Sequence, residues 1–213
     1  MKKFICLLGW MLTGIVNAAT VDIYVGDNDG YGIGIADNGV TGAFSFTTDN
    51  RSLTELGATN GAQQTDFYSA LFSPLPATFD VVFSLTENLV WATFEVDVAD
   101  LQASQLGQFS VLFNGVLKAS IFNFQDGFGN SAIHSFSLDA NDLSNANTSN
   151  EFVVTFNRNG SNDAVAFDYF RLTGETQSLS VQTRALAVPE PRSIVLLGLG
   201  LASLAFARRR SQA

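Results

Sequence analysis

The sequence predicts an all-β fold, a jelly-roll-like antiparallel β-sandwich, with an N-terminal signal peptide and a C-terminal single transmembrane helix. Three observations lead to this expectation: the alternation of apolar and polar residues, the polar turns between the alternating segments, and the composition of the two ends of the chain. Short segments in which apolar and polar residues alternate recur through the middle of the chain, and polar turns separate them. The third observation is that both ends of the chain are apolar and flanked by basic residues. We expect the sandwich to occupy residues 19–176, and a linker to occupy residues 177–187.

The alternation of apolar and polar residues places individual strands. Phe79, Val81 and Phe83, for example, recur at every second position, which is the period of a strand with one buried face. Asn114-Gly115 suits the positive φ angles of a type I′ turn, so the strands on either side of it should form a hairpin. The expected strands are residues 21–25, 79–85, 90–98, 109–113, 116–124, 133–138, 152–156 and 165–173, with single helical turns near residues 52–56, 99–105 and 141–144.

Residues 1–18 have the features of a secretory signal peptide. Lys2-Lys3 precede the apolar run Phe4 to Val16, and small residues follow it, so we expect cleavage between Ala18 and Ala19. Cys6 is the only cysteine and lies inside this segment. The mature protein therefore has no thiol for a disulfide, for thiol catalysis or for a cysteine-ligated zinc ion.

The chain ends in a second targeting segment, residues 188–213. Val188-Pro189-Glu190-Pro191 forms a spacer that its two prolines keep out of a helix. An apolar run follows at residues 193–207, and at a rise of 1.5 Å per residue it would span only about 22 Å of a hydrocarbon core roughly 30 Å thick. Arg208-Arg209-Arg210 then form a basic tail, which the positive-inside rule places in the cytoplasm. A short span of this kind suits an anchor that is later removed.

This tail resembles the PEP-CTERM sorting signal of exported bacterial proteins. The residues that carry the resemblance are Pro189-Glu190-Pro191, the apolar run rich in Gly, Leu and Ala, and the arginine cluster. The resemblance implies export by the general secretion machinery and a precursor that is held in the inner membrane with its C-terminus in the cytoplasm. It also implies cleavage by an exosortase, after which the protein is released or attached at the cell surface. The usual setting of the family is a Gram-negative bacterium that makes exopolysaccharide.

The charge of the mature domain restricts its partners. Residues 19–187 hold 19 of the 20 acidic residues but only five of the 11 Lys and Arg residues, a net charge of −14. Such a surface repels nucleic acid and anionic lipid, which excludes nucleic acid as a partner, and it attracts divalent cations. Residues 19–187 are enough for one domain with a core of its own.

The second half of the domain also resembles the galactose-binding-like jelly rolls of carbohydrate-binding modules. The resemblance covers residues 75–175 and rests on the strand pattern. It implies the sandwich fold and makes carbohydrate a ligand to consider. The segments that carry it are Phe109-Ser110-Val111-Leu112-Phe113-Asn114-Gly115, Phe136-Ser137-Leu138, Asn150-Glu151-Phe152-Val153-Val154 and Val165-Ala166-Phe167-Asp168-Tyr169-Phe170-Arg171-Leu172.

A calcium site is predicted at Asp27, Asn28 and Asp29, with Asp168 completing it. The three neighbouring residues supply oxygen ligands, and Gly30 allows the chain to turn around an ion. Alternation places Asp168 on the core face of the last strand, where an unpaired carboxylate would be costly. Two alternatives remain open: the acidic turn is solvated and binds nothing, or a backbone cap or Arg171 satisfies Asp168.

Catalytic residues are not indicated. His134, the only histidine, shares a strand face with apolar residues and is interpreted as a packed or edge-strand residue. No serine stands in a nucleophile motif that a triad would need. Glu95 and Asp97 lie about 7 Å apart on one strand face, a spacing that glycosidase carboxylates also use, but alternation assigns them to the solvent-facing side.

Trp91 lies on the same strand face and is the predicted ligand-binding residue, because an exposed indole ring is a platform for a sugar or a partner. Cover for a neighbouring loop is the alternative role. We therefore expect a non-enzymatic cell-surface or matrix protein that binds carbohydrate, associated with exopolysaccharide. The alternatives are a secreted hydrolase that acts on polysaccharide and a purely structural matrix protein.

Overall fold

The computed structural model describes residues 18–40, 47–69, 74–118 and 127–177, which belong to one compact unit, Ile15–Ser178. The predicted signal peptide apart from Ala18, the linker apart from its first residue and the whole sorting signal lie outside the described residues. None of the helices among the described residues is long and apolar enough to cross a membrane.

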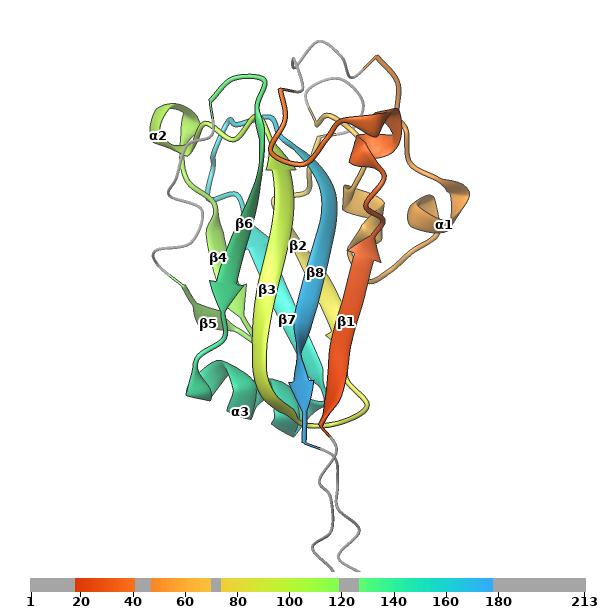
Figure 1. The fold of residues 1–213 in the computed structure, drawn as a ribbon. Coiled ribbons are helices and arrows are strands. Elements are labelled where there is room, and N and C mark those ends of the chain that lie inside the picture. Colours follow the sequence, from red (N-terminus) through yellow and green to blue (C-terminus); the bar gives the residue numbers. More distant parts are fainter. Residues whose placement is uncertain (1–17, 41–46, 70–73, 119–126, 178–213) are drawn as a thin grey trace, which may run out of the picture. The chain divides into compact units, whose positions relative to one another are not determined.

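Two four-stranded antiparallel sheets form the sandwich, which confirms the predicted fold class (Figure 1). Their strand orders are β1-β8-β3-β6 and β2-β7-β4-β5, so neighbours in each sheet are mostly distant in the sequence. The strands are β1 Ala19–Gly26, β2 Thr78–Ser84, β3 Leu89–Ala99, β4 Ser110–Phe113, β5 Val116–Leu117, β6 Ser131–Ser137, β7 Glu151–Asn157 and β8 Ala166–Thr176.

Phenylalanine rings from the facing sides of both sheets fill the space between them. In β2 and β7 every second residue is buried, as the period-two pattern predicted. The ring of Phe83 in β2 meets that of Phe94 in β3 edge to face at a centroid distance of 6.2 Å, and Phe79 meets Phe167 in the same way at 5.9 Å. These contacts join the two sheets directly.

Most predicted elements are confirmed, with one clear correction. Asn114 and Gly115 join β4 to β5 with φ angles of 44° and 81°, as a type I′ turn requires. The single helical turn expected near residues 141–144 is instead the ten-residue helix α3, Ala140–Ser149. Its Asn- and Ser-rich sequence has low helix propensity, and the capping box between Asp139 and Asp142 offsets that weakness. Residues 119–124 of the expected fifth strand lie outside the described residues.

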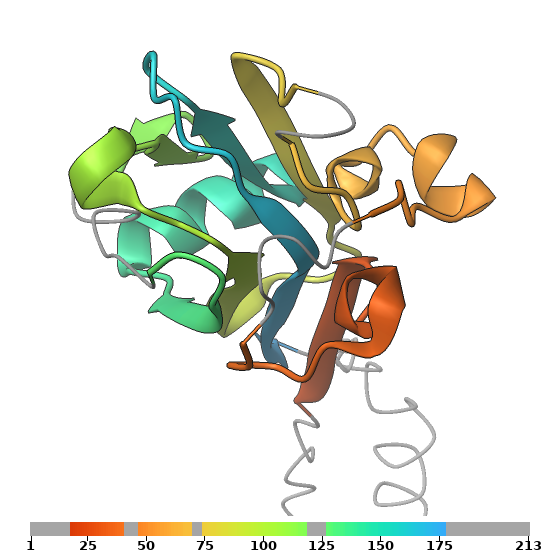
Figure 2. The same cartoon turned by 90° about the horizontal axis from the view of Figure 1, so that it is seen from above.

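The two ends of the sandwich are built differently. Helix α3 closes one end, and the loops after β1 and β3 form the other, together with the short helices α1 (Leu53–Leu56) and α2 (Ala103–Leu106) (Figure 1). Figure 2 looks onto this second end, where a π-type turn at Gly30–Gly34 lies beside β1, with α1 and α2 on opposite sides. A 3₁₀ turn at Ala62–Gln64 follows α1. We call this the acidic end, because two clusters of carboxylates described below lie there.

Candidate functional site

The acidic end brings two sets of three aspartates together. In the first cluster, Asp27, Asp29 and Asp66 each offer a carboxylate oxygen, and these oxygens lie within 4.8 Å of one another. The second cluster meets the same distance criterion and consists of Asp37, Asp97 and Asp168. Asp66, Asp97 and Asp168 are at most 1% exposed, whereas the other three are exposed to solvent.

Close contact between β1 and a distant loop positions the first cluster. Strand β1 ends at Gly26, whose φ of +82° and position leave no room for a side chain. A Cβ atom there would lie 2.8 Å from Cγ2 of Thr65 and 2.9 Å from the carbonyl oxygen of Asp168. The backbone N–H of Asp66 donates to the carbonyl oxygen of Phe167 at 2.8 Å. Asp66 is therefore tied to β8 while Asp27 and Asp29 follow directly from β1.

Tyr31 organises the second cluster. It is fully buried with a left-handed backbone (φ 62°, ψ 31°), and its N–H donates to Oδ1 of Asp168 at 2.6 Å. The N–H of Gly30 donates to Oδ2 of the same carboxylate at 3.3 Å, and the Tyr31 hydroxyl donates to Oδ1 of Asp97 at 2.8 Å. One turn thus supplies donors to both buried carboxylates of this cluster.

Burial disfavours the ionised form of every buried aspartate in the two clusters. It raises the pKa of Asp97 to about 6, against the hydrogen bond from Tyr31, and the pKa of Asp168 to about 7, against the backbone N–H groups. It raises the pKa of Asp66 to about 10, and the adjacent Glu55 contributes to that rise. Asp66 is therefore the least well compensated carboxylate of the three.

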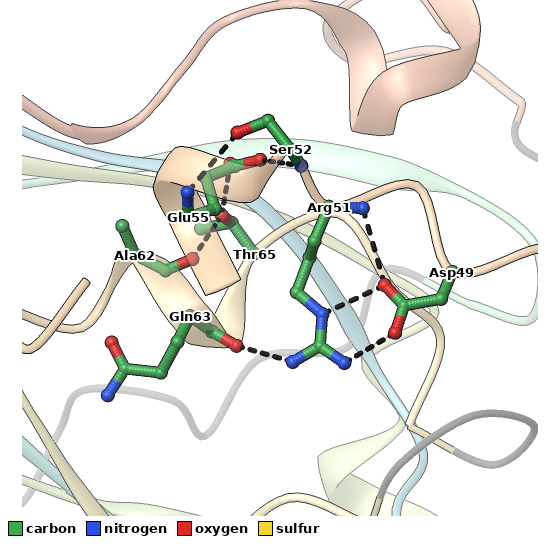
Figure 3. A network of polar contacts seen from close by, with 7 residues as sticks. All are labelled: Asp49, Arg51, Ser52, Glu55, Ala62, Gln63 and Thr65. Carbon is green, nitrogen blue, oxygen red and sulfur yellow. Dashed lines mark hydrogen bonds and ion pairs between the residues drawn. The ribbon is translucent and has the colours of Figure 1, made fainter. Parts of the chain in front are cut away.

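Glu55 shares a side-chain hydrogen bond with Asp66. It also accepts hydrogen bonds from Ser52 and Thr65, which Figure 3 shows. Its Oε2 accepts from the backbone N–H of Ser52 at 2.8 Å, and its Oε1 accepts from the Thr65 hydroxyl at 2.7 Å. Burial opposes ionisation of Glu55, but these hydrogen bonds outweigh it and lower the pKa of the carboxyl. Glu55 therefore remains a negative charge beside Asp66.

Arg51 does not neutralise this charge. Its guanidinium makes two contacts with the carboxylate of Asp49, at 2.8 and 2.5 Å, and a third with the carbonyl oxygen of Gln63 at 2.8 Å (Figure 3). The same group lies over the Phe67 ring, 4.2 Å from its centroid. Each of its three nitrogens thus donates a hydrogen bond within its own loop.

The predicted calcium ligands are divided between the two clusters. Asp27 and Asp29 lie together in the first, and Asn28 is exposed between them, whereas Asp168 belongs to the second. The backbone cap that was left open as an alternative for Asp168 is present, while Arg171 pairs with Asp22 instead. The sequence reasoning missed Asp66, because nothing in its local sequence indicates that it reaches β8.

A second candidate surface is the outer face of the β1-β8-β3-β6 sheet. Trp91 is 46% exposed there, which confirms its predicted exposure, and Tyr24 is 38% exposed on the same face. Between these rings the Arg171 guanidinium contacts Asp22 at 2.8 Å and Glu95 at 3.6 Å, and lies over the Tyr24 ring. By register the outer face consists of Thr20, Asp22, Tyr24, Trp91, Thr93, Glu95, Ser135, Ser137, Arg171, Thr173 and Glu175.

His134 and Asp97, which the sequence brought into question as catalytic residues, lie in different environments. His134 lies half-buried on the edge strand β6, opposite the buried Val96, as its interpretation as a packed edge residue predicted. The expectation that Glu95 and Asp97 both face solvent is wrong for Asp97, which is fully buried. The period-two pattern placed it correctly on the outer side of β3, but Tyr31 from a distant turn covers it.

Comparison with known proteins locates the targeting signal. Residues 187–210 match the model of the PEP-CTERM protein-sorting motif. The chain carries a PEP-CTERM motif. This agrees with the resemblance drawn from Pro189-Glu190-Pro191 and the basic tail, and it marks the chain as an exported exosortase substrate with a membrane-anchored precursor.

The folded domain has little similarity to characterised proteins. No curated protein matches the chain. Among solved structures, dimeric latent PorU from Porphyromonas gingivalis matches with 16% sequence identity and a TM-score of 0.31. That match covers 47% of this chain and 10% of the other.

Proposed function

We propose that the protein acts at the cell surface or in the extracellular matrix as a non-enzymatic protein that binds exopolysaccharide through the outer face. The observation that carries the proposal is a pair of exposed aromatic rings, Trp91 and Tyr24, with a charged hydrogen-bonding network between them. Aromatic rings stack against the apolar faces of sugar rings, and charged side chains bind their hydroxyl groups.

The spacing of the two rings favours an oligosaccharide over a single sugar. Tyr24 lies opposite Arg171 and Trp91 opposite Glu175, so the rings are four residues apart along β8 and on strands two places apart. At a rise of about 3.3 Å per residue and a strand spacing of about 4.8 Å, this corresponds to roughly 13 Å along the sheet and 10 Å across it. The net charge of residues 19–187 favours a neutral polysaccharide, because an acidic polymer would be repelled.

The test is affinity electrophoresis of the exported protein in gels that contain neutral or acidic polysaccharide. We expect retardation by a neutral polymer and a loss of affinity of about tenfold or more in Trp91→Ala and in Tyr24→Ala, because each removes a stacking surface. Phe128→Ala is the matched control, since Phe128 is 59% exposed but is not one of the outer-face residues. Retardation that both outer-face variants leave unchanged would contradict the proposal.

The alternative is a secreted hydrolase that acts on polysaccharide. A glycosidase uses two carboxyl groups that both reach the substrate. In β3, Asp97 is buried, and Glu95 accepts hydrogen bonds from Tyr169 at 3.1 Å and Ser135 at 3.3 Å besides its contact with Arg171. These engagements favour the non-enzymatic proposal. Release of reducing ends by the exported protein, abolished by Glu95→Gln, would establish the hydrolase instead.

Processing has its own test. We propose that the mature protein begins near Ala19 and ends near Pro189 to Pro191, and mass spectrometry of both termini measures this directly. Replacing Pro189-Glu190-Pro191 with alanines should leave the precursor in the membrane fraction. Secreted protein that still carries Arg208-Arg209-Arg210 would contradict C-terminal cleavage.

A further inference from the structure

We infer that Asp27, Asp29 and Asp66 form a calcium site at the acidic end. The site is separate from the outer face and from the sugar binding proposed for it. One carboxylate oxygen from each residue lies within 4.8 Å of the other two, which is close enough for a single ion to contact all three.

Asp66 supplies the observation that distinguishes this cluster from an ordinary acidic surface. The residue is 1% exposed, and its Oδ1 has no hydrogen-bond partner among the described residues. A buried carboxylate oxygen without a donor is destabilising. A bound cation would satisfy this oxygen.

No basic side chain does so in the described part of the chain. The ion pairs there involve Arg51, Lys118 and Arg171, and their partners are Asp49, Asp139, Asp142, Asp22 and Glu95. None of the three carboxylates of the first cluster is among those partners. Among the described residues, therefore, no printed ion pair supplies a counter-charge to this cluster.

The ligand chemistry and the access route both favour calcium. The cluster offers only oxygen ligands, whereas zinc prefers nitrogen and sulfur. Asp27 and Asp29 are exposed, and Asp27 also lines an open hollow between β1 and α1, so an ion can enter. Asp29 is already oriented, since its Oδ1 accepts from the N–H of Gly32 at 2.5 Å. The neighbouring Asn28 amide and water can complete the larger coordination number of calcium.

The experiment is calorimetric titration of calcium into the chelator-treated exported protein, with thermal unfolding measured in parallel. We expect one ion per chain and, at a calcium concentration about 100 times Kd, a rise in Tm of roughly 5–10 °C. Asp27→Asn combined with Asp29→Asn should abolish both signals. Because both residues are exposed, the variant should still fold, which its Tm without calcium will show.

Asp37→Asn is the matched control, because Asp37 is the exposed member of the second cluster. This variant should keep the full calcium response. The inference is overturned if millimolar calcium leaves the Tm unchanged, if the double variant retains the shift, or if Asp37→Asn loses it. Trp91→Ala should also retain the calcium response, so failure of sugar binding and failure of this site give different results.

Discussion

At the α3 end of the sandwich, Asp142 is 2% exposed and its Oδ1 lies 2.6 Å from Nζ of Lys118. At the acidic end, Asp66 is 1% exposed and forms no such ion pair with a described residue. The two aspartates are buried to the same degree, but only the first has a cation supplied by the chain itself. The charge of a buried carboxylate is thus compensated in two ways in one domain: by a lysine of the chain at Asp142 and, as we infer, by an ion from solvent at Asp66.

Backbone donors show the same contrast. Asp139 and Asp142 cap the N-terminus of α3 reciprocally, with donors from within four residues of sequence. Asp97 and Asp168 depend on Tyr31, which is 66 and 137 residues away. The N-terminal cap of α3 is therefore assembled from local contacts, whereas the acidic end forms only when β1, β3 and β8 have come together.

The largest effect is expected from adding a methyl group at the junction of the acidic end. Gly26→Ala places a Cβ atom 2.8 Å from Thr65 and forces a left-handed conformation on alanine. We expect a loss of about 3 kcal/mol in the free energy of unfolding, measured by urea denaturation. Gly115→Ala is the control near the α3 end, with a similar φ of +81° and no atom within 4 Å of the new Cβ. Gly115→Ala should lower the free energy of unfolding by only about 1 kcal/mol. Equal losses would contradict tight packing at Gly26.

The next largest effect is expected on the pH dependence of the free energy of unfolding. Burial raises the pKa of Asp97 to about 6, that of Asp168 to about 7 and that of Asp66 to about 10. A raised pKa in the folded state means that the stability is greatest below the unfolded value near 4 and is lost as the pH rises through the folded values. We expect the calcium-free protein to lose roughly 2–4 kcal/mol of unfolding free energy between pH 4.5 and 7.5. A free energy of unfolding that rises steadily between pH 4.5 and 7.5 would contradict this prediction. It would show that the buried aspartates of the acidic end are compensated to the same extent as Asp142.

Removing the ammonium group of Lys118 should leave the α3 end, like the acidic end, with a buried aspartate that has no cation from the chain. Lys118→Met leaves Asp142 buried without its partner, and we expect a loss of about 1–2 kcal/mol, discounted because Lys118 remains partly exposed. Asp27→Asn should have the opposite sign in the absence of calcium, because it removes repulsion without breaking an ion pair. Chemical denaturation of both variants in chelator measures the difference, and a loss of stability in Asp27→Asn would reject the comparison.

The smallest effect is expected on the outer face. Trp91 is 46% exposed, so Trp91→Ala should change the free energy of unfolding by less than about 0.5 kcal/mol while it weakens sugar binding. Thermal unfolding distinguishes this role from cover for a neighbouring loop. A loss of 2 kcal/mol or more, as expected for a buried tryptophan, would assign Trp91 to packing.

Strand positions could be predicted from the sequence because each depends on its own alternation. Sequence alternation also gave the correct side of β3 for Asp97, but it could not give its burial, which depends on Tyr31 from another element. The proposed calcium ligands Asp27 and Asp29 could be predicted because they are neighbours in an acidic turn. Asp66 was missed because its position depends on a backbone contact with Phe167, about a hundred residues away. Local patterns identify elements, and contacts between distant segments decide which polar groups meet.

The strand order of the first sheet also has a mechanical consequence. β8 lies between β1 and β3, with eight residue pairs to one neighbour and nine to the other. The segment that bears the sorting motif follows β8 in the chain. A pulling force on that segment would run along the strand, so both ladders of hydrogen bonds would be loaded in shear at once and could not open one pair at a time. Tension transmitted through the C-terminal segment would therefore meet a strand that is held by hydrogen bonds on both sides.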